Sequence, residues 1–236
     1  MSKSQFVFGC LVYPQQDQID FTGPFEVLSR IPGSTVHVIS NDGEPIRDVK
    51  GLILTPEMRI SDAPPLDLLL VSGGSGQRAL MEDDEILSFI RRQDESGRYV
   101  FSVCTGALLC GAAGILRGRR ATTHWASWDL LHYYGGIPER ARVVVDGNLI
   151  STAGVTAGLD GALTVAAMLC GQRVAEEIQL DIEYAPDPPF ESGTPESALP
   201  EVVKALLARY ARGKEMREAQ ARRFADAHPL GLRNGP

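Results

Sequence analysis

The chain has 236 residues, of which 44% are hydrophobic and 22% are charged. This composition is typical of a globular protein and excludes disorder for most of the chain. The formal net charge of −7 disfavours non-specific binding to nucleic acid or to an anionic membrane surface, because both favour proteins with a basic face.

Hydropathy and cysteine usage narrow the class further. No apolar run reaches about 18 residues, so no transmembrane helix is predicted, and the apolar N-terminal stretch indicates a first strand and not a signal peptide. The cysteines are widely spaced and form no Cys-x-x-Cys pair, which disfavours a disulfide framework and a zinc knuckle. We therefore expect reduced thiols in a cytoplasmic protein, at Cys10, Cys104, Cys110 and Cys170.

The first half of the chain alternates segments typical of strands and of helices. Residues 6–13 are rich in Val, Phe and Leu and end at Pro14, which predicts a buried strand. A helix is expected from Thr22 to about Arg30, because Pro24 suits a first helical turn. Next come a strand, a turn-rich hairpin region, a strand ending in a glycine-rich turn and a helix stopped by Gly97, over residues 35–40, 41–56, 66–71 and 85–96.

The second half continues the alternation. A strand over residues 99–103 leads directly into Cys104-Thr105-Gly106 and a helix over 107–113. Asp146-Gly147 between two apolar runs is a strong hairpin signal. We also expect helices over residues 124–134, 156–170, 172–182 and 201–227, an irregular proline-rich segment over 185–200, and frayed residues up to 236.

This order of elements predicts one α/β domain over residues 1–236, with a helical C-terminal arm from about residue 201. Alternating strands and helices indicate a doubly wound, mostly parallel sheet with helices on both faces. Ligands of such sheets bind beyond the carboxyl ends of the strands. The turns at residues 73–76 and 104–106 are therefore the places where a site is expected.

Cys104 is the candidate nucleophile. It lies at a sharp strand-to-helix turn, as in the nucleophile elbow of hydrolases, and Gly106 would let the helix pass close to the strand. The N-terminus of that helix should favour the thiolate and lower the pKa of Cys104. The alternative is a buried structural thiol, which is the reading we favour for the other three cysteines.

Asp20 is the candidate proton-transfer group. It follows the first strand and is flanked by Ile19 and Phe21, which should desolvate its carboxyl group and raise its pKa. Its alternative role is to cap the helix that follows. Asp17, in a polar context, is expected in a solvated loop.

Two further features are ambiguous. His124 is either a base for Cys104 or a structural histidine at a helix start, and spacing does not decide between them. The loop Gly73-Gly74-Ser75-Gly76 matches no phosphate-binding motif. Its backbone N–H groups could support an oxyanion at Cys104, or the glycines serve only a tight turn.

Together these residues resemble the ThiJ/PfpI superfamily, which has a class I glutamine amidotransferase-like (flavodoxin-like) fold. The similarity lies in Cys104-Thr105-Gly106, Gly73-Gly74 and the stretch Ala-Thr-Thr-His124-Trp. Within the superfamily, the segments at residues 19–24, 79–83 and 183–190 resemble the isocyanide (isonitrile) hydratases. The resemblance covers residues 6–224.

The resemblance implies a lyase that hydrates isocyanides to N-substituted formamides. Cys104 would attack the terminal carbon, Asp20 would move protons to nitrogen and from water, and Thr105 would orient the site. Gly73 and Gly74 would give substrate or oxyanion support, and the partners would be a small isocyanide and a second copy of the chain. No metal or organic cofactor is implied.

Three positions could change the pocket. Ser72 precedes the glycine loop where these hydratases usually have Pro, and Val155 stands where Ile is familiar. Trp128 could narrow the space around the substrate. None of the three removes a catalytic group.

Two alternative functions remain open. The first is a glyoxalase-like or amidase-like enzyme of the same fold, with His124 as the base for Cys104. The second is a non-catalytic ligand or redox sensor, since sensor domains of AraC-type regulators share this fold. Those regulators carry a further C-terminal DNA-binding region of about a hundred residues, and too little sequence follows Phe190 to form one.

Overall fold

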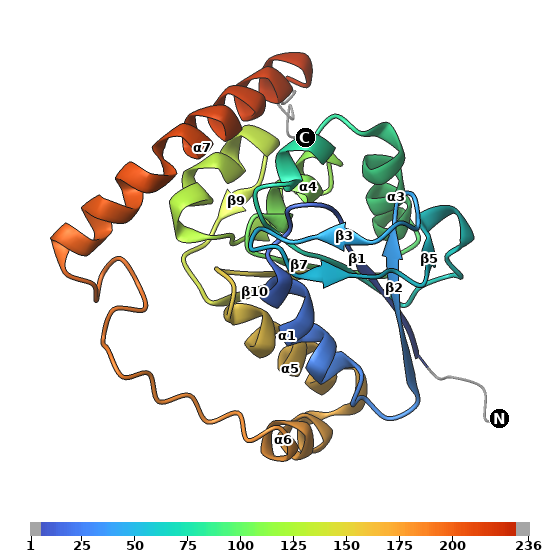
Figure 1. Cartoon of the computed structure of the whole chain (residues 1–236). Coiled ribbons are helices and arrows are strands. Elements are labelled where there is room, and N and C mark those ends of the chain that lie inside the picture. The colour runs from blue at the N-terminus through green and yellow to red at the C-terminus, as the bar shows by residue number, and fades with distance from the viewer. Residues whose placement is uncertain (1–5, 230–236) are drawn as a thin grey trace, which may run out of the picture.

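A seven-stranded sheet forms the centre of the computed structural model, which describes residues 6–229 (Figure 1). The strand order is β10-β11-β7-β6-β1-β2-β5, and every neighbouring pair is parallel except the β10–β11 hairpin. The strands are β1 Phe6–Leu11, β2 Ser34–Ser40, β5 Met58–Arg59, β6 Leu68–Val71, β7 Tyr99–Val103, β10 Val143–Asp146 and β11 Leu149–Thr152.

Two small sheets and a set of helices surround this sheet. β3 and β4 form an antiparallel pair and β8 and β9 a parallel one, at Ile46–Arg47, Ile53–Leu54, Arg120–Ala121 and Ile137–Pro138. The α-helices are α1 Gln18–Leu28, α2 Gln77–Leu80, α3 Asp84–Glu95, α4 Gly106–Ala112, α5 Ala157–Cys170, α6 Gln172–Asp181 and α7 Pro200–Ala227. Two 3-10 helices, η1 and η2, span Ile60–Asp62 and Trp125–Tyr134. The architecture confirms the predicted doubly wound, mostly parallel sheet.

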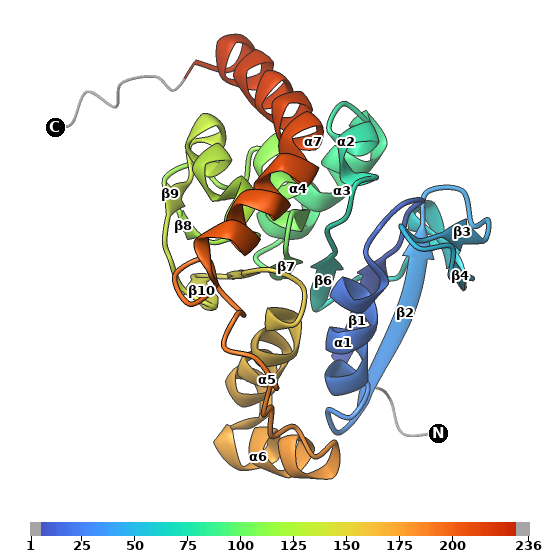
Figure 2. The same cartoon turned by 60° about the vertical axis from the view of Figure 1, so that its left-hand side comes forward.

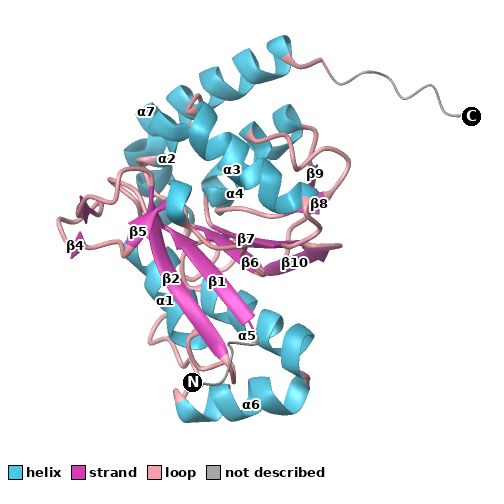
Figure 3. Cartoon of the chain, turned by 90° about the vertical axis from the view of Figure 1, so that its right-hand side faces the viewer, coloured by secondary structure: helices cyan, strands magenta, loops and turns pink. Residues whose placement is uncertain are grey.

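Helices cover both faces of the sheet because the central strands are apolar on both sides (Figure 3). In β6, Leu69 and Val71 face the core beneath α3, α4 and η2, whereas Leu68 and Leu70 face the core beneath α1 and α5. All four side chains are fully buried. An alternating strand would bury only one face, so this continuous apolar run explains the three-layer fold.

The order in which the chain adds strands to the sheet changes direction between the parallel neighbours β1 and β6. From β1 the chain proceeds to β2 on one side, and later returns to β6 and β7 on the other. The segments after these strands therefore meet at one edge, which is the usual ligand position in doubly wound sheets. Three of those segments are the start of α1, the loop after β6 and the start of α4.

The last helix lies outside the three layers. From α6, an extended segment over residues 182–199 runs along the outside of the molecule and brings α7 back across η2 (Figures 1 and 2). Phe224 of α7 packs its ring 4.9 Å from that of Tyr134 in η2, and Ala221 is fully buried. This contact places α7 over the carboxyl edge of the sheet.

The start of α1 differs from the prediction. The helix begins at Gln18, four residues before Thr22, and Pro24 lies inside it. Asp17 is the N-cap and accepts a hydrogen bond from the backbone N–H of Ile19 at 3.4 Å. Asp17 lies in the loop before the helix, as expected, but it is half-buried and its side chain caps α1, so the capping role considered for Asp20 belongs to Asp17.

The other long elements agree with the predictions to within a few residues. η2 is a 3-10 helix where a helix was expected, and it ends at Gly135, whose φ is 75°. The short elements β5, β9, α2 and η1 had not been predicted, since two to four residues give no measurable periodicity. The short strand expected to end near residues 121–123 corresponds to β8. The predicted fraying near residue 236 lies outside the described residues.

Candidate active site at the carboxyl edge of the sheet

Cys104, Asp20 and Thr105 come together where the strand order of the sheet changes direction. Cys104 follows β7, Thr105 is the N-cap of α4, and Asp20 lies in the first turn of α1. All three are buried, and Asp20 is fully so. The structure thus brings together the three residues that the sequence singles out as catalytic.

The backbone at Cys104 has the strained geometry of an elbow. Its φ is 56°, a left-handed conformation that costs a non-glycine residue about 1–2 kcal/mol. Thr123 holds the turn by donating its hydroxyl hydrogen bond to the Cys104 carbonyl at 2.6 Å. A Cβ on Gly106 would lie 2.1 Å from the Val71 carbonyl oxygen, so only glycine allows this close approach of α4 to β6.

Burial disfavours the ionised form of the Asp20 carboxyl group. Its Oδ2 accepts a hydrogen bond from the Gly73 N–H at 2.9 Å. Its Oδ1 is buried, and no donor in the described residues meets it with hydrogen-bond geometry. Desolvation, followed by the negative charge of Asp17, raises the pKa of Asp20 to about 7. The Gly73 N–H and the Cys104 thiol act in the opposite direction. This pKa suits proton transfer near neutral pH.

The pKa of Cys104 is raised well above its ordinary value, and the expected lowering is therefore wrong. Desolvation is the largest cause, and the charge of Asp20 is the next. The backbone N–H groups of Thr105 and Val155 favour the thiolate, but the desolvation of the sulfur and the charge of Asp20 outweigh them. At neutral pH the thiol and the carboxyl group thus hold at least one proton between them.

The N–H groups of Gly73 and Gly74 are both taken by side chains of the candidate site. The N–H of Gly73 is taken by Asp20, and the N–H of Gly74 donates to Thr105 Oγ1 at 3.1 Å. The N–H groups directed at the sulfur belong to Thr105 and Val155 instead. These two N–H groups, which the sequence suggested for an oxyanion, hold Asp20 and Thr105 in this structure.

His124 lies half-buried beside the site, and its ring is engaged by the backbone of η2. Its Nδ1 accepts a hydrogen bond from the N–H of Ala126 at 3.2 Å, which caps η2 and leaves the ring proton on Nε2. Burial, followed by the charge of Arg217, lowers the pKa of His124 to about 4. A neutral imidazole whose acceptor nitrogen is already bonded is a poor base for Cys104, which favours the structural reading.

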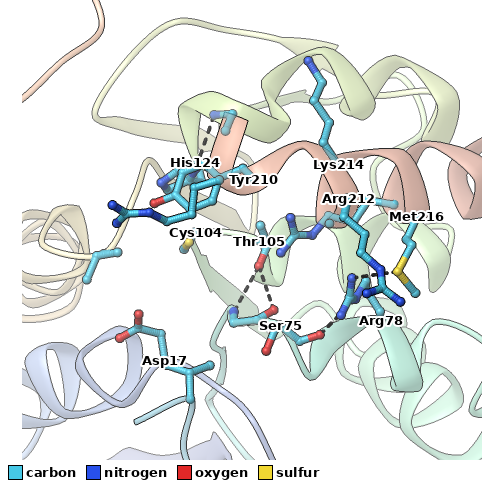
Figure 4. A pocket seen from close by; sticks show the side chains of 17 residues that line it. Asp17, Ser75, Arg78, Cys104, Thr105, His124, Tyr210, Arg212, Lys214 and Met216 are labelled. Atoms are coloured by element: carbon cyan, nitrogen blue, oxygen red, sulfur yellow. Dashed lines mark hydrogen bonds between the residues drawn. The ribbon is translucent and has the colours of Figure 1, made fainter. Parts of the chain in front are cut away.

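A pocket of about 590 Å³ opens onto Cys104 and is closed on the opposite side by α7 (Figure 4). No pattern in the sequence predicts that α7 reaches the site. Positively charged side chains dominate its polar lining, and Asp17 is the acidic residue in it. Trp128 does not line the pocket; Arg140 stacks on its ring at 4.7 Å. The pocket-lining face of α7 comprises Arg209, Tyr210, Arg212, Gly213, Lys214, Met216 and Arg217.

The remaining cysteines and the possible metal-binding side chains indicate no second site in the described residues. Cys10 and Cys110 are buried in the core, Cys170 is half-buried at the end of α5, and all four thiols are free. Within residues 6–229, no three His, Cys, Asp or Glu side chains gather in a way that could hold a metal ion. No helix in the same range has both the length and the apolarity needed to cross a membrane.

Comparisons with known proteins agree with this geometry. The family model of the DJ-1/PfpI family matches residues 9–168. An isonitrile hydratase of Pseudomonas putida is 48% identical over 217 residues, which cover 92% of this chain and 95% of that protein. A solved ThiJ/PfpI family protein from Pseudomonas syringae gives a TM-score of 0.89 at 37% identity, covering 92% of this chain and 90% of the other. DJ-1beta of Drosophila melanogaster shares the fold, with a TM-score of 0.69 at 23% identity over 79% of this chain and all of that one.

Proposed function

The chain belongs to the DJ-1/PfpI family, and we propose that it is an enzyme that hydrates isocyanides, R–N≡C, to N-substituted formamides through Cys104. The observation that carries the proposal is the buried pair of Cys104 and Asp20, in a chain 48% identical to an isonitrile hydratase over 92% of its length. The terminal carbon of an isocyanide is a soft electrophile, which suits attack by sulfur once a proton is supplied beside it.

In the first step, Cys104 Sγ forms a bond to the terminal carbon. The thiol and Asp20 together supply the proton that this same carbon receives, giving an S–CH=N–R thioimidate. The N–H groups of Thr105 and Val155 stabilise the sulfur as it loses its proton. Asp20, with a pKa of about 7, is poised to exchange this proton near neutral pH.

In the second step, water adds to the thioimidate carbon. Its proton passes to the Asp20 carboxylate and from there to the nitrogen, which leaves a tetrahedral S–CH(OH)–NHR intermediate. The C–S bond then breaks and releases the formamide, and the hydroxyl proton returns to the thiolate and carboxylate pair. One water is consumed for each isocyanide, and no electrons are exchanged with another reactant.

The test is to follow formamide production from an alkyl or aryl isocyanide. Cys104→Ala should abolish turnover, and Asp20→Asn should lower kcat by at least about 100-fold while the protein stays folded. Cys170→Ala is the matched control, since this half-buried thiol lies outside the pocket and its loss should leave the rate unchanged. Full turnover by Cys104→Ala, or none by the unmodified protein, would refute the proposal.

The same assay separates this mechanism from one with a histidine base. His124→Ala should retain hydration within a few-fold, because Nδ1 of His124 serves as a helix cap. A loss comparable to that of Cys104→Ala would instead assign His124 to the chemistry and favour the glyoxalase-like or amidase-like alternative.

The proposal includes a homodimer in the cytoplasm. Apolar side chains of α6 and the segment that follows it project into solvent in the single chain: Leu180 is 81% exposed, Phe190 77% and Leu199 62%. A second copy of the chain would cover exposed apolar side chains of this kind. Four free cysteines suit a reducing compartment.

A further inference from the structure

The cations in the pocket have no role in the hydration of a neutral isocyanide. Five positively charged side chains line it against one carboxylate, in a chain whose net charge is −7. The cations come from α2 and α7, whereas Asp17 lies across the pocket from the labelled ones, Arg78, Arg212 and Lys214 (Figure 4). The full set is Arg78, Arg209, Arg212, Lys214 and Arg217.

None of these five forms an ion pair within residues 6–229, although arginines elsewhere commonly do. The contrast is sharpest within α7. One turn beyond the pocket face, Arg222 pairs with Glu218 and Arg223 with Glu82. Among the described residues, the pocket-facing cations of this helix have no carboxylate partner, whereas the two arginines just beyond them do.

Two of the guanidinium groups converge on one point of α7. A Cβ on Gly213 would lie 3.7 Å from Nη1 of Arg217 and 3.8 Å from Nη1 of Arg78. Because Gly213 has no side chain, the space beside both guanidinium groups stays open. Arg78 is held by the Ser75 carbonyl and the Met216 sulfur, and Arg217 by a long 3.4 Å hydrogen bond to Gln77 Oε1. All these partners are uncharged.

This arrangement is unfavourable unless an anion occupies it. Arg217 is half-buried, and burial, together with the charge of Arg78, lowers the pKa of its guanidinium group. Two like charges in a partly desolvated pocket repel each other, and a carboxylate between them would relieve the repulsion while accepting paired hydrogen bonds. The same pocket contains Cys104, so one molecule could contact both.

We propose that the preferred substrate is an isocyanide bearing a carboxylate, which is bound between Arg78 and Arg217 beside Gly213 while the isocyano carbon reaches Cys104. This inference rests on the proposed function and specifies its substrate class. The molecule as a whole is acidic and repels anions. The other cations of the pocket would offset this repulsion and raise the local concentration of the anionic substrate; they are Arg209, Arg212 and Lys214.

The decisive measurement compares each ω-isocyanoalkanoate with its methyl ester, over a series of chain lengths. The acid should exceed the ester in kcat/KM by at least about tenfold at the best chain length, and added salt should reduce that ratio. Arg78→Gln and Arg217→Gln should each bring the ratio toward one. Arg222→Gln is the matched control, since this exposed arginine of α7 lies outside the pocket and is already paired.

Charge reversal provides a second variant in case Arg217→Gln fails to fold. Arg78→Glu should invert the preference, so that an isocyanide bearing an ammonium group is turned over faster than the carboxylate. An ester as good as its acid in the unmodified protein, or a ratio that both arginine variants leave unchanged, would overturn the proposal.

A binding experiment separates this inference from the proposed function. Calorimetry on Cys104→Ala would compare an ω-formamidoalkanoate, the expected product, with its methyl ester. Tighter binding of the acid that Arg78→Gln abolishes would support the anion site even if no isocyanide were hydrated. Equal binding of acid and ester would refute the anion site, even if simple isocyanides were hydrated.

Discussion

At the centre of the site, two neighbouring groups both hold their protons more tightly than usual. The pKa of Asp20 is raised to about 7 and that of Cys104 well above its ordinary value, in each case chiefly by burial. Losing the second proton would place two negative charges side by side in a desolvated space. The pair therefore keeps one proton over a wide range above neutrality, which is the proton that addition of a thiol to an isocyanide requires.

The raised pKa of Asp20 predicts a stability that falls as the pH rises. Below an unfolded-state pKa of 3.8 both states bind the proton, whereas between 3.8 and about 7 only the folded state keeps it, so ionisation favours unfolding. The full cost, up to about 4 kcal/mol, is reached above pH 7. Asp20→Asn should thus be more stable than the unmodified protein in urea at pH 8, with the difference vanishing near pH 4. An unchanged or lower stability of Asp20→Asn at pH 8 would contradict the assignment.

The site has no room for a side chain at position 73, where the chain has Gly73. A Cβ there would lie 2.6 Å from the Thr105 nitrogen and 2.7 Å from Asp20 Oδ2, so Gly73→Ala must displace both groups. We expect kcat/KM for an isocyanide to fall by about 100-fold, because displacements near 1 Å cost this much. Gly193→Ala is the control, since a Cβ at Gly193 meets no atom within 4 Å. Equal rates for the two variants would show that the loop does not position Asp20 and Thr105.

At the scale of elements, small residues set how closely the helices approach the sheet. Along α5, Gly158 faces Pro24 of α1 and Gly161 faces Phe101 and Thr152 of the sheet. Contact with Gly158 lets α1 keep a proline in its interior while packing against α5. The position of α1 in turn fixes Asp20 beneath Cys104, so these glycines serve the site from a distance.

Gly161→Ala tests this packing. The added Cβ would lie 2.5 Å from Thr152 Cγ2 and 2.7 Å from Phe101 Cε2, and Phe101 is fully buried with no space to move. Alanine gains about 1 kcal/mol in helix propensity, but overpacking this core should cost about 2–3 kcal/mol, so we expect a net loss of about 1–2 kcal/mol in the free energy of unfolding. Met168→Ala, at an exposed position of the same helix, should change stability far less. A stabilised Gly161→Ala would show that α5 can move away from the sheet.

At the scale of the whole molecule, charge and apolar surface are unevenly distributed. The chain is acidic, with a net charge of −7, yet unpaired cations gather around a single pocket. Apolar side chains are exposed mainly on the segments outside the three layers, including Leu180, Phe190 and Leu199. The first feature concerns the substrate, and the second concerns assembly.

The exposed apolar side chains of α6 and the segment after it predict a dimer that polar substitutions would weaken. Light scattering should give twice the mass of the chain for the unmodified protein. The double variant Leu180→Ser/Phe190→Ser should shift the dimer–monomer equilibrium by at least about tenfold, since both side chains are more than three-quarters exposed in the single chain. Leu52→Ser, at a half-exposed position on the β3–β4 side, serves as the control. A monomer at all concentrations, or a dimer that the double variant leaves intact, would place any interface elsewhere.

The sequence by itself determined the fold class, most element bounds, the elbow at Cys104 and the buried Asp20. These features are encoded locally: hydrophobic periodicity selects strands and helices, and glycine at residue 106 permits the turn. The sequence was less reliable at the start of α1, where the capping side chain of Asp17 began the helix earlier than Pro24 suggested.

Only the tertiary structure decided what surrounds Cys104. The pKa of the thiol depends on how far packing desolvates it, which outweighed the helix N-terminus. The partners of the Gly73 and Gly74 N–H groups come from other segments of the chain. The cations of α7 lie more than a hundred residues beyond Cys104 in sequence, and they reach the pocket because Ala221 and Phe224 dock that helix on η2. Such long-range contacts follow from the packing of complete elements, which no local pattern of residues specifies.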